Sequence, residues 1–321
     1  MKSDKTVMET YEINWNKMTE FHGMAKLMKI LRYNNSFIEE MIFLKKYILF
    51  NIIMPILLIF ILPIMIFVFA IQYFSISEIN LLFVTLEINE NADISNYISN
   101  LSVITTIVVL FSIIFITIRN LNKNRVFLSG NIYGTNYYIF YKLAKLLGFK
   151  KISLIRKPYY AMFKIVMNND FDELVNLNKE NIELNADIFI RVDESKFHNI
   201  NNLRECNLIV SDTYKIRLEQ LPIDKQDIDT IEIERIGHAG VRISSQELVN
   251  EVRKAVIKIV ATGAKINLFL TTSTLNTYQI IKECFMQADR DKMELEIFQQ
   301  DTTTRDKKFK DKGKKVLRRK K

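Results

Sequence analysis

Cysteine, histidine and glycine-rich motifs are scarce in this sequence of 321 residues. The two cysteines, Cys206 and Cys284, have no Cys or His neighbour at metal-ligand spacing, which excludes a disulfide scaffold and a local zinc motif. The phosphate-binding loop that ends in Lys-Ser/Thr and the dinucleotide glycine fingerprint are both missing. We therefore expect no metal and no cofactor.

A surplus of positive charge is also missing from most of the chain, although the net charge is +9. Residues 305–321 contain eleven Lys or Arg and two Asp, so this segment accounts for the whole surplus. A neutral body argues against a basic face that binds DNA or RNA. We expect residues 305–321 to form a disordered, solvated tail. The alternative is contact with anionic lipid, which is worth about 1 kcal/mol per basic residue near the surface.

Two uncharged segments dominate the first 120 residues and predict two transmembrane helices. Residues 47–74, "YILFNIIMPILLIFILPIMIFVFAIQYF", contain no charge, and about 20 apolar residues suffice to cross a membrane. Pro55 and Pro63 are tolerated in a membrane helix and are expected to kink it. The second segment, "LSVITTIVVLFSIIFITI", covers residues 101–118. Its Ser and Thr side chains either bond to a neighbouring helix or bond back to their own carbonyls, and helix packing is favoured over a pore lining.

The flanking charges predict the orientation of these helices. Lysines precede the first apolar segment, and Arg119, Lys123 and Arg125 follow the second. The intervening residues 75–100 carry four acidic side chains and no Lys or Arg. The positive-inside rule then places both termini in the cytoplasm and the acidic loop outside, in a two-span protein of the inner membrane.

The residues before the first apolar segment are not expected to be a signal peptide, because 46 polar-rich residues precede it and no small-residue cleavage site follows. Apolar side chains recur at helical spacing between Met18 and Leu31. We expect residues 1–46 to form a cytosolic amphipathic helix on the membrane or on the head; a helical lead-in to the first span is equally compatible.

From residue 119 to residue 304, short apolar runs alternate with helical patterns. Strands are predicted at "RVFLSG", "KKISLIRKP", "NADIFIRV", "CNLIVSD", "TIEIERIG", "KINLFLTT" and "MELEIFQQ". The helix "SQELVNEVRKAVIKIVATG" has Ser245 as its expected N-cap and Gly263 as its end. A second helix runs through "NYYIFYKLAKLLGF" and ends at Gly148. This alternation predicts a cytosolic α/β domain with a mainly parallel, Rossmann-like sheet.

Two strand-to-helix crossings in this domain carry polar residues suited to an anionic or polar ligand. Ligands of parallel sheets bind beyond the carboxyl ends of the strands, and backbone N–H groups that begin a helix favour anions. The first crossing contains Ser129, Gly130, Asn131, Tyr133, Gly134, Thr135 and Asn136. The second contains Thr271, Thr272, Ser273, Thr274 and Asn276. Each residue taken singly is also compatible with an ordinary loop or capping role.

Basic and aromatic residues near the first crossing complete the predicted site. Arg156 and Lys157 are candidate phosphate partners, and Tyr133, Tyr159 and Tyr160 could stack on bases. The two tyrosines after Pro158 are equally compatible with the core.

Catalytic groups are harder to find. His198 lies in a polar stretch, and His238 has no evident nucleophile or carboxylate beside it, so both are more compatible with structural roles. Asp212 or Glu234 with His238 is the only acid–base pair that an enzyme could use. We predict no catalytic residues.

The segment "TIEIERIGHAGVRISSQELVNEVRKAVIKIVATGAKINLFLTTSTLNTYQII" resembles the C-terminal half of SAVED domains, which are related to CARF domains. The resemblance extends over roughly residues 125–300 and is most evident over 230–285. It implies a receptor for a cyclic oligonucleotide made by a partner nucleotidyltransferase. Two spans ahead of such a domain look like an effector of bacterial anti-phage (CBASS) signalling, which assembles on ligand binding and disrupts the membrane in abortive infection. A membrane-tethered nucleotide enzyme and a two-span scaffold that binds a protein partner remain alternatives.

Overall fold

The computed structural model describes residues 41–73, 92–129, 134–135, 137–175, 189–198, 203–237, 240–286, 293–301 and 306–318. The chain divides into two compact units, Met1–Leu49 and Phe50–Lys321. In the first unit the described residues begin at Met41 and are helical, and Phe43 stacks on Tyr47 with 6.5 Å between ring centroids. The predicted amphipathic helix before Met41 lies outside the described residues.

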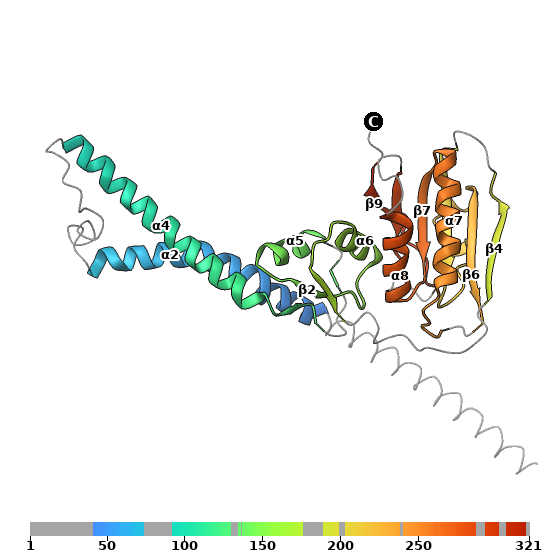
Figure 1. Cartoon of the computed structure of the whole chain (residues 1–321), viewed down its shortest axis with the longest axis horizontal. Coiled ribbons are helices and arrows are strands. Elements are labelled where there is room, and N and C mark those ends of the chain that lie inside the picture. Colours follow the sequence, from blue (N-terminus) through green and yellow to red (C-terminus); the bar gives the residue numbers. More distant parts are fainter. Residues whose placement is uncertain are drawn as a thin grey trace, which may run out of the picture. The chain divides into compact units, whose positions relative to one another are not determined.

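Two long apolar helices precede the α/β domain (Figure 1). A π-helical segment, Leu49–Ile53, leads into α2, Met54–Tyr73, and α4 covers Ala92–Asn122. Stretches of these helices at Met41–Phe69 and Ile104–Asn122 are long and apolar enough to cross a membrane, with mean hydropathies of 3.1 and 2.1. Most of their large apolar side chains are exposed, so these are not the core helices of a soluble domain.

The prolines and hydroxyls of these helices are accommodated locally. Pro63 lies inside α2, and the π-helical segment comes just before Pro55, which cannot donate a backbone hydrogen bond. The hydroxyls of Ser112 and Thr117 donate to the carbonyls four residues earlier, both at 2.8 Å. Of the two predicted alternatives, these two hydroxyls therefore bond to carbonyls of their own helix. Phe60 of α2 packs on Phe111 of α4 with ring centroids 5.6 Å apart.

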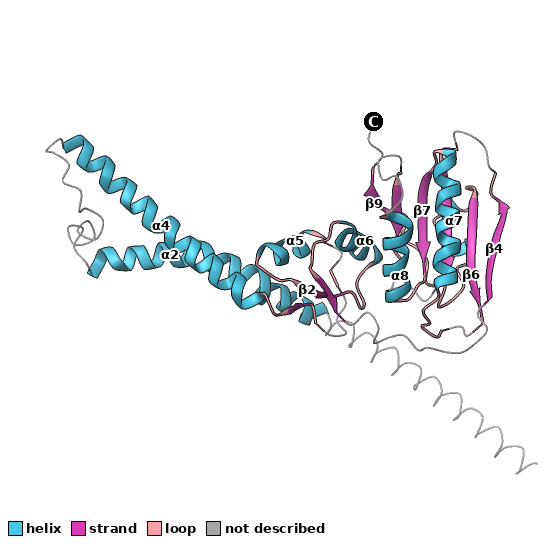
Figure 2. Ribbon diagram, in the orientation of Figure 1, coloured by secondary structure: helices cyan, strands magenta, loops and turns pink. Residues whose placement is uncertain are grey.

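A small parallel sheet follows the apolar helices (Figure 2). It has the order β1-β2-β3, with β1 at Val126–Phe127, β2 at Lys151–Ser153 and β3 at Glu173–Val175. The connecting helices are α5, Ile139–Leu146, and α6, Tyr159–Met167. Gly148 ends the α5 turn at φ 93°, and a Cβ there would lie 2.6 Å from the backbone of Arg119, so only glycine fits.

The larger sheet has six strands in the order β4-β6-β5-β7-β8-β9. Its strands are β4, Phe189–Lys196; β5, Glu205–Ser211; β6, Thr230–Ile236; β7, Lys265–Leu270; β8, Leu295–Phe298; and β9, Lys314–Leu317. The four central strands are parallel, whereas β4 and β9 are antiparallel edges. The prediction of an α/β domain is confirmed, with a parallel centre and mixed edges.

Helices α7, Gln246–Thr262, and α8, Thr274–Ile280, cover one face of this sheet (Figure 1). The α7 boundaries follow the predicted signals, because the Ser245 hydroxyl accepts from Leu248 N and Gly263 adopts φ 77°. A π-helical segment, Ile281–Phe285, continues α8. The opposite face packs on the short 3₁₀ helices Leu218–Gln220 and Ile223–Lys225, where Ile209, Phe269 and Phe298 form a core with Phe309.

The basic C-terminal segment differs from the expected disordered tail. Phe309 is buried and packs edge-on against Phe269, with ring centroids 5.1 Å apart. Val316 is buried as well, and β9 pairs with β8. Apolar residues spaced along the segment hold residues 306–318 against the sheet, although its composition is that of a solvated tail.

Candidate functional site

The carboxyl edge of the six-stranded sheet contains a buried ion pair. Asp212 follows β5 and Arg235 is near the end of β6, and both side chains are 0% exposed. Arg235 Nε donates to Asp212 Oδ1 at 2.6 Å. Its other nitrogens donate to backbone oxygens of Asp212 at 2.9 Å, Val241 at 2.8 Å and Gly237 at 3.3 Å. Four of the five N–H groups of the guanidinium are used in joining the ends of two strands, so its role is structural.

The second carboxylate oxygen of Asp212 holds the loop after β7. It accepts hydrogen bonds from Ser273 N at 3.1 Å and from Asn276 Nδ2 at 2.8 Å. Asn276 Nδ2 also donates to Ile243 O, while its Oδ1 accepts from Ser245 N. Three segments that are distant in sequence therefore meet on one buried carboxylate and one buried amide.

The predicted hydroxyl cluster occupies the expected edge but is engaged within the protein. Thr271 Oγ1 donates to Tyr214 O at 2.7 Å, and the hydroxyls of Thr272 and Thr277 are 2.7 Å apart. Ser273 Oγ accepts from Asn276 N and caps α8. Four of the five predicted residues here are buried, and only Thr274 is half-exposed. Their polar groups shape the edge, and any ligand contact from this loop would come from its backbone or from Thr274.

The first predicted loop lies at the carboxyl edge of the small sheet. Ser129 is exposed after β1, and Gly130, Asn131, Tyr133 and Asn136 lie outside the described residues. Thr135 is buried; its hydroxyl accepts from Tyr137 N at 3.1 Å and its carbonyl from the Tyr141 hydroxyl at 3.1 Å.

The structure brings this loop against the predicted basic pair. Gly134 N donates to Arg156 O at 3.0 Å, and a Cβ at Gly134 would lie 2.3 Å from Lys157 Cδ. Arg156 is exposed, at φ 54°, whereas Lys157 is buried and donates to Ile155 O at 3.1 Å. Burial, and secondarily the neighbouring Arg156 charge, lower the pKa of Lys157 to about 8.

Tyr159 joins the two carboxyl edges. Its hydroxyl donates to Thr272 O at 3.0 Å, and its backbone N donates to Gln299 Oε1 at 3.0 Å. Burial raises the pKa of this phenol. Of the two tyrosines predicted to stack on bases or to enter the core, Tyr159 bonds inward and Tyr160 lines a surface recess.

Two basic recesses adjoin these edges, and the C-terminal segment contributes lysines to both. The first has a volume of about 500 Å³; its lining has four basic and two acidic side chains, and comprises Tyr214, Lys215, Arg217, Glu219, Gln220, Asp306, Lys307 and Lys308. Lys307 Nζ lies 3.8 Å from the Tyr214 ring centroid. The second has a volume of about 260 Å³ and is lined by Tyr137, Tyr160, Gln299, Lys310, Lys312 and Lys314 around Ile297. Sequence reasoning missed both, because it assigned these lysines to a disordered tail.

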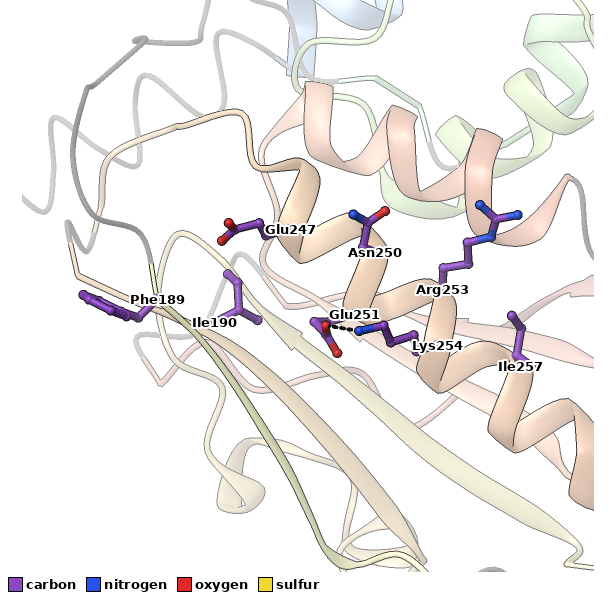
Figure 3. A pocket seen from close by; sticks show the side chains of 8 residues that line it. All are labelled: Phe189, Ile190, Glu247, Asn250, Glu251, Arg253, Lys254 and Ile257. Carbon is purple, nitrogen blue, oxygen red and sulfur yellow. Dashed lines mark hydrogen bonds and ion pairs between the residues drawn. The ribbon is translucent and has the colours of Figure 1, made fainter.

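A larger groove of about 880 Å³ runs between α7 and the edge strand β4 (Figure 3). Phe189 and Ile257 supply exposed apolar surface, while the Lys254 ammonium bonds to Glu251 at 2.7 Å. Its charges are of both signs, and it contains none of the predicted ligand residues. It therefore lacks the basic character expected for an anion site.

The two carboxylates that an enzyme could have used together with His238 are both bound to basic side chains. Asp212 binds Arg235, and Glu234 pairs with Arg191 and Lys215. His238 lies outside the described residues, and exposed His198 contacts Asp229. Among the residues that the structure describes, no group of three or more His, Cys, Asp or Glu is positioned for a metal ion.

The α/β domain is tied to the end of the second apolar helix. Asn122 Nδ2 donates to Leu147 O at 3.0 Å, beside the end of α5. Arg125 binds Asn122 Oδ1 at 3.0 Å and Asn51 Oδ1 at 2.7 Å. The small sheet and both apolar helices thus share one polar junction.

Comparisons with known proteins identify the family of the chain through a family profile. No curated protein matches the sequence. A structure of the Acinetobacter baumannii Cap4 SAVED/CARF-domain containing receptor with 2'3'3'-cAAA has 8% identity and a TM-score of 0.33, over 50% of this chain and 36% of that one. The same receptor with 3'3'3'-cAAA has 9% identity and a TM-score of 0.35, over 56% of this chain and 45% of that one. The aligned parts span less than half of either receptor chain. Residues 32–317 match a family profile, and the chain belongs to the family of SMODS- and Ubiquitin system-associated 2TM effector domains.

Proposed function

We propose that this chain is a non-enzymatic membrane effector of bacterial anti-phage (CBASS) defence, gated by a cyclic oligonucleotide. The apolar helices span the inner membrane with both termini in the cytoplasm. The α/β domain binds a messenger made by a partner nucleotidyltransferase. Binding favours a homo-oligomer, which disrupts the membrane and causes abortive infection.

The observation that carries this proposal is the polar junction between the α/β domain and the apolar helices. Asn122 of α4 donates to Leu147 O at the end of α5, and Arg125 links Asn122 to Asn51 in the π-helical segment that leads into α2. The same small sheet bears Arg156 and Lys157 at its carboxyl edge, where ligands of such sheets bind. A ligand there acts on the helices only if it binds one arrangement of the junction better than another.

The membership in a family of two-span effectors and the outward-facing apolar side chains of α2 and α4 support the membrane part. The sequence resemblance to SAVED domains supports the ligand class. We place the ligand at the two carboxyl edges that Tyr159 joins, with Ser129, Arg156 and Lys157 on the small sheet and the Thr271–Asn276 loop on the larger one.

The ligand test uses the full chain in sealed liposomes filled with a self-quenched dye. Cyclic di- and trinucleotides are titrated by calorimetry, and dye release is followed in parallel. We expect one ligand to bind and to release dye. Binding without release would contradict the effector mechanism and favour a scaffold, and turnover of the bound nucleotide would favour an enzyme.

The orientation has its own test, because the two native cysteines are buried. Asn89→Cys should react with a membrane-impermeant maleimide added outside spheroplasts. Asn124→Cys, on the exposed segment after α4, should react only after the membrane is permeabilised. The reverse pattern would overturn the proposed topology.

A further inference from the structure

The recess around Tyr160 combines aromatic rings with basic side chains. It is lined by Tyr137, Tyr160, Gln299, Lys310, Lys312 and Lys314. We propose that this Tyr–Lys recess binds one nucleotide unit of an anionic oligonucleotide, with a base against a tyrosine and a phosphate on the lysines. This assignment rests on the proposed function, and it adds a site outside the two predicted loops.

Two lysines of the Tyr–Lys recess, Lys310 and Lys312, have no acidic side chain bound to them in the described part of the chain. Within the described part of the chain, the ammonium groups of Lys310 and Lys312 form no ion pair, whereas Lys315 on the same segment pairs with Glu294 at 3.2 Å. Lys310 and Lys312 are both exposed. Burial, and secondarily the neighbouring Lys310 charge, lower the pKa of Lys314, so the two ammonium groups repel each other. An anion would relieve this repulsion.

The aromatic side chains are placed for stacking. The Tyr137 side chain is 70% exposed although its backbone is fixed by Thr135. Lys314 Nζ lies 4.9 Å from the Tyr160 ring centroid, so a cation already contacts that ring. Stacking on an aromatic side chain strengthens binding whatever the base, because every base has a π-face.

The remaining lining residues, Gln299 and Ile297, lie on or just after β8. Gln299 follows β8, and its Oε1 accepts from Tyr159 N at 3.0 Å, which fixes the amide group. Ile297 of β8 is buried behind it. A volume of about 260 Å³ falls short of the roughly 300–1,000 Å³ typical of sites that enclose a whole drug-sized ligand. A single nucleotide unit, with the rest of the molecule outside, fits this size.

The recess also joins the two halves of the α/β domain. Tyr160 belongs to α6, while Lys310 and Lys314 belong to the segment that pairs with the six-stranded sheet. Lys164 of α6 donates to Val316 O at 2.8 Å beside it. A nucleotide bound there would contact both halves at once.

The test measures binding to the full chain in nanodiscs of zwitterionic lipid, by calorimetry. The probes are cyclic diadenylate, cyclic triadenylate, linear triadenylate and inorganic tripolyphosphate. Lys310→Gln with Lys312→Gln should weaken nucleotide binding at least tenfold, because two charge-assisted contacts to phosphate are lost. Tyr160→Leu should weaken it about tenfold, and Tyr160→Phe, which keeps the ring, should not.

The matched control is Lys307→Gln with Lys308→Gln. It removes the same charge from the same segment but from the recess around Tyr214, and should change affinity by less than twofold. If both double variants lose the same affinity, the loss comes from the change in net charge and not from the recess, and the assignment is overturned. Unchanged binding in the Lys310/Lys312 variant would also overturn it, while leaving the proposed function intact.

Two further outcomes separate the ligand sources. Tripolyphosphate binding as tight as that of the nucleotides, with no loss in Tyr160→Leu, would make the recess a phosphate site and refute the base contact. A wild-type chain that binds none of the three nucleotides refutes the nucleotide assignment and, with it, the proposed response to adenylate messengers.

Discussion

Removing the carboxylate of Asp212 should destabilise the α/β domain strongly. Asp212→Ala leaves the Arg235 guanidinium buried without its counter-charge and deprives Ser273 N and Asn276 Nδ2 of their acceptor. Breaking one partner of a buried pair costs about 3–5 kcal/mol. For a domain of this size, that corresponds to a fall in Tm of roughly 6–20 °C.

The measurement is thermal unfolding of the full chain in detergent, followed by circular dichroism. Arg191→Gln is the control. Arg191 of β4 pairs with Glu234, which precedes Arg235 on β6, but the Arg191 side chain is half exposed. An exposed pair is worth about 0–1 kcal/mol, so Tm should move by a few degrees at most.

The double variant Asp212→Ala with Arg235→Met makes the reasoning falsifiable. It removes the uncompensated charge, so it should be more stable than Asp212→Ala alone. If the double variant is less stable than the single one, or if Arg191→Gln is as damaging as Asp212→Ala, the buried ion pair does not hold this edge of the sheet together.

Three further predictions follow from burial. Phe309→Ala should cost about 3–5 kcal/mol of unfolding free energy, measured by thermal denaturation, whereas the adjacent exposed Lys308→Ala should be nearly neutral. The pKa of Lys157 is about 8 in the folded protein against an unfolded value of 10.5, so the unfolded chain binds more protons between these pH values. Wild-type stability should therefore rise from pH 8 to pH 10.5 relative to Lys157→Met, by at most about 1.4 kcal/mol per pH unit, and a constant difference would refute this. Burial raises the pKa of Cys206 and Cys284 to about 12, so neither thiol should react with a maleimide at neutral pH until the protein is unfolded, as mass spectrometry would report.

Local signals predict elements well where the chain itself supplies the partner. Ser245 and Gly263 define the ends of α7 because a cap and a left-handed turn need only neighbouring residues. The small strand β3 was not predicted, since three residues with little burial give no periodic pattern.

The polar cluster at the sheet edge illustrates the limit of such reasoning. The spacing of Thr271 to Asn276 after an apolar run places these residues at a strand end. Their partners, Asp212, Tyr214 and Ser245, come from other segments, so the sequence does not reveal that their hydrogen bonds are formed within the protein. Likewise, the C-terminal lysines are held beside the sheet because β9 pairs with β8 and Phe309 packs on Phe269, whereas composition alone predicts a solvated tail.

A ligand in the proposed Tyr–Lys recess would have enough binding energy available to influence the two apolar helices. Shifting a two-state equilibrium from 1:99 to 99:1 requires about 5.5 kcal/mol of differential affinity. One stacked base and two charge-assisted phosphate contacts supply roughly 4–9 kcal/mol. These contacts bridge α6 and the C-terminal segment, and α6 shares its sheet with α5, whose end is bonded to Asn122 of α4. The available energy reaches the required range only if most of these contacts form in one state and not in the other. Gating therefore requires that the two halves of the domain fit the ligand in the active state alone.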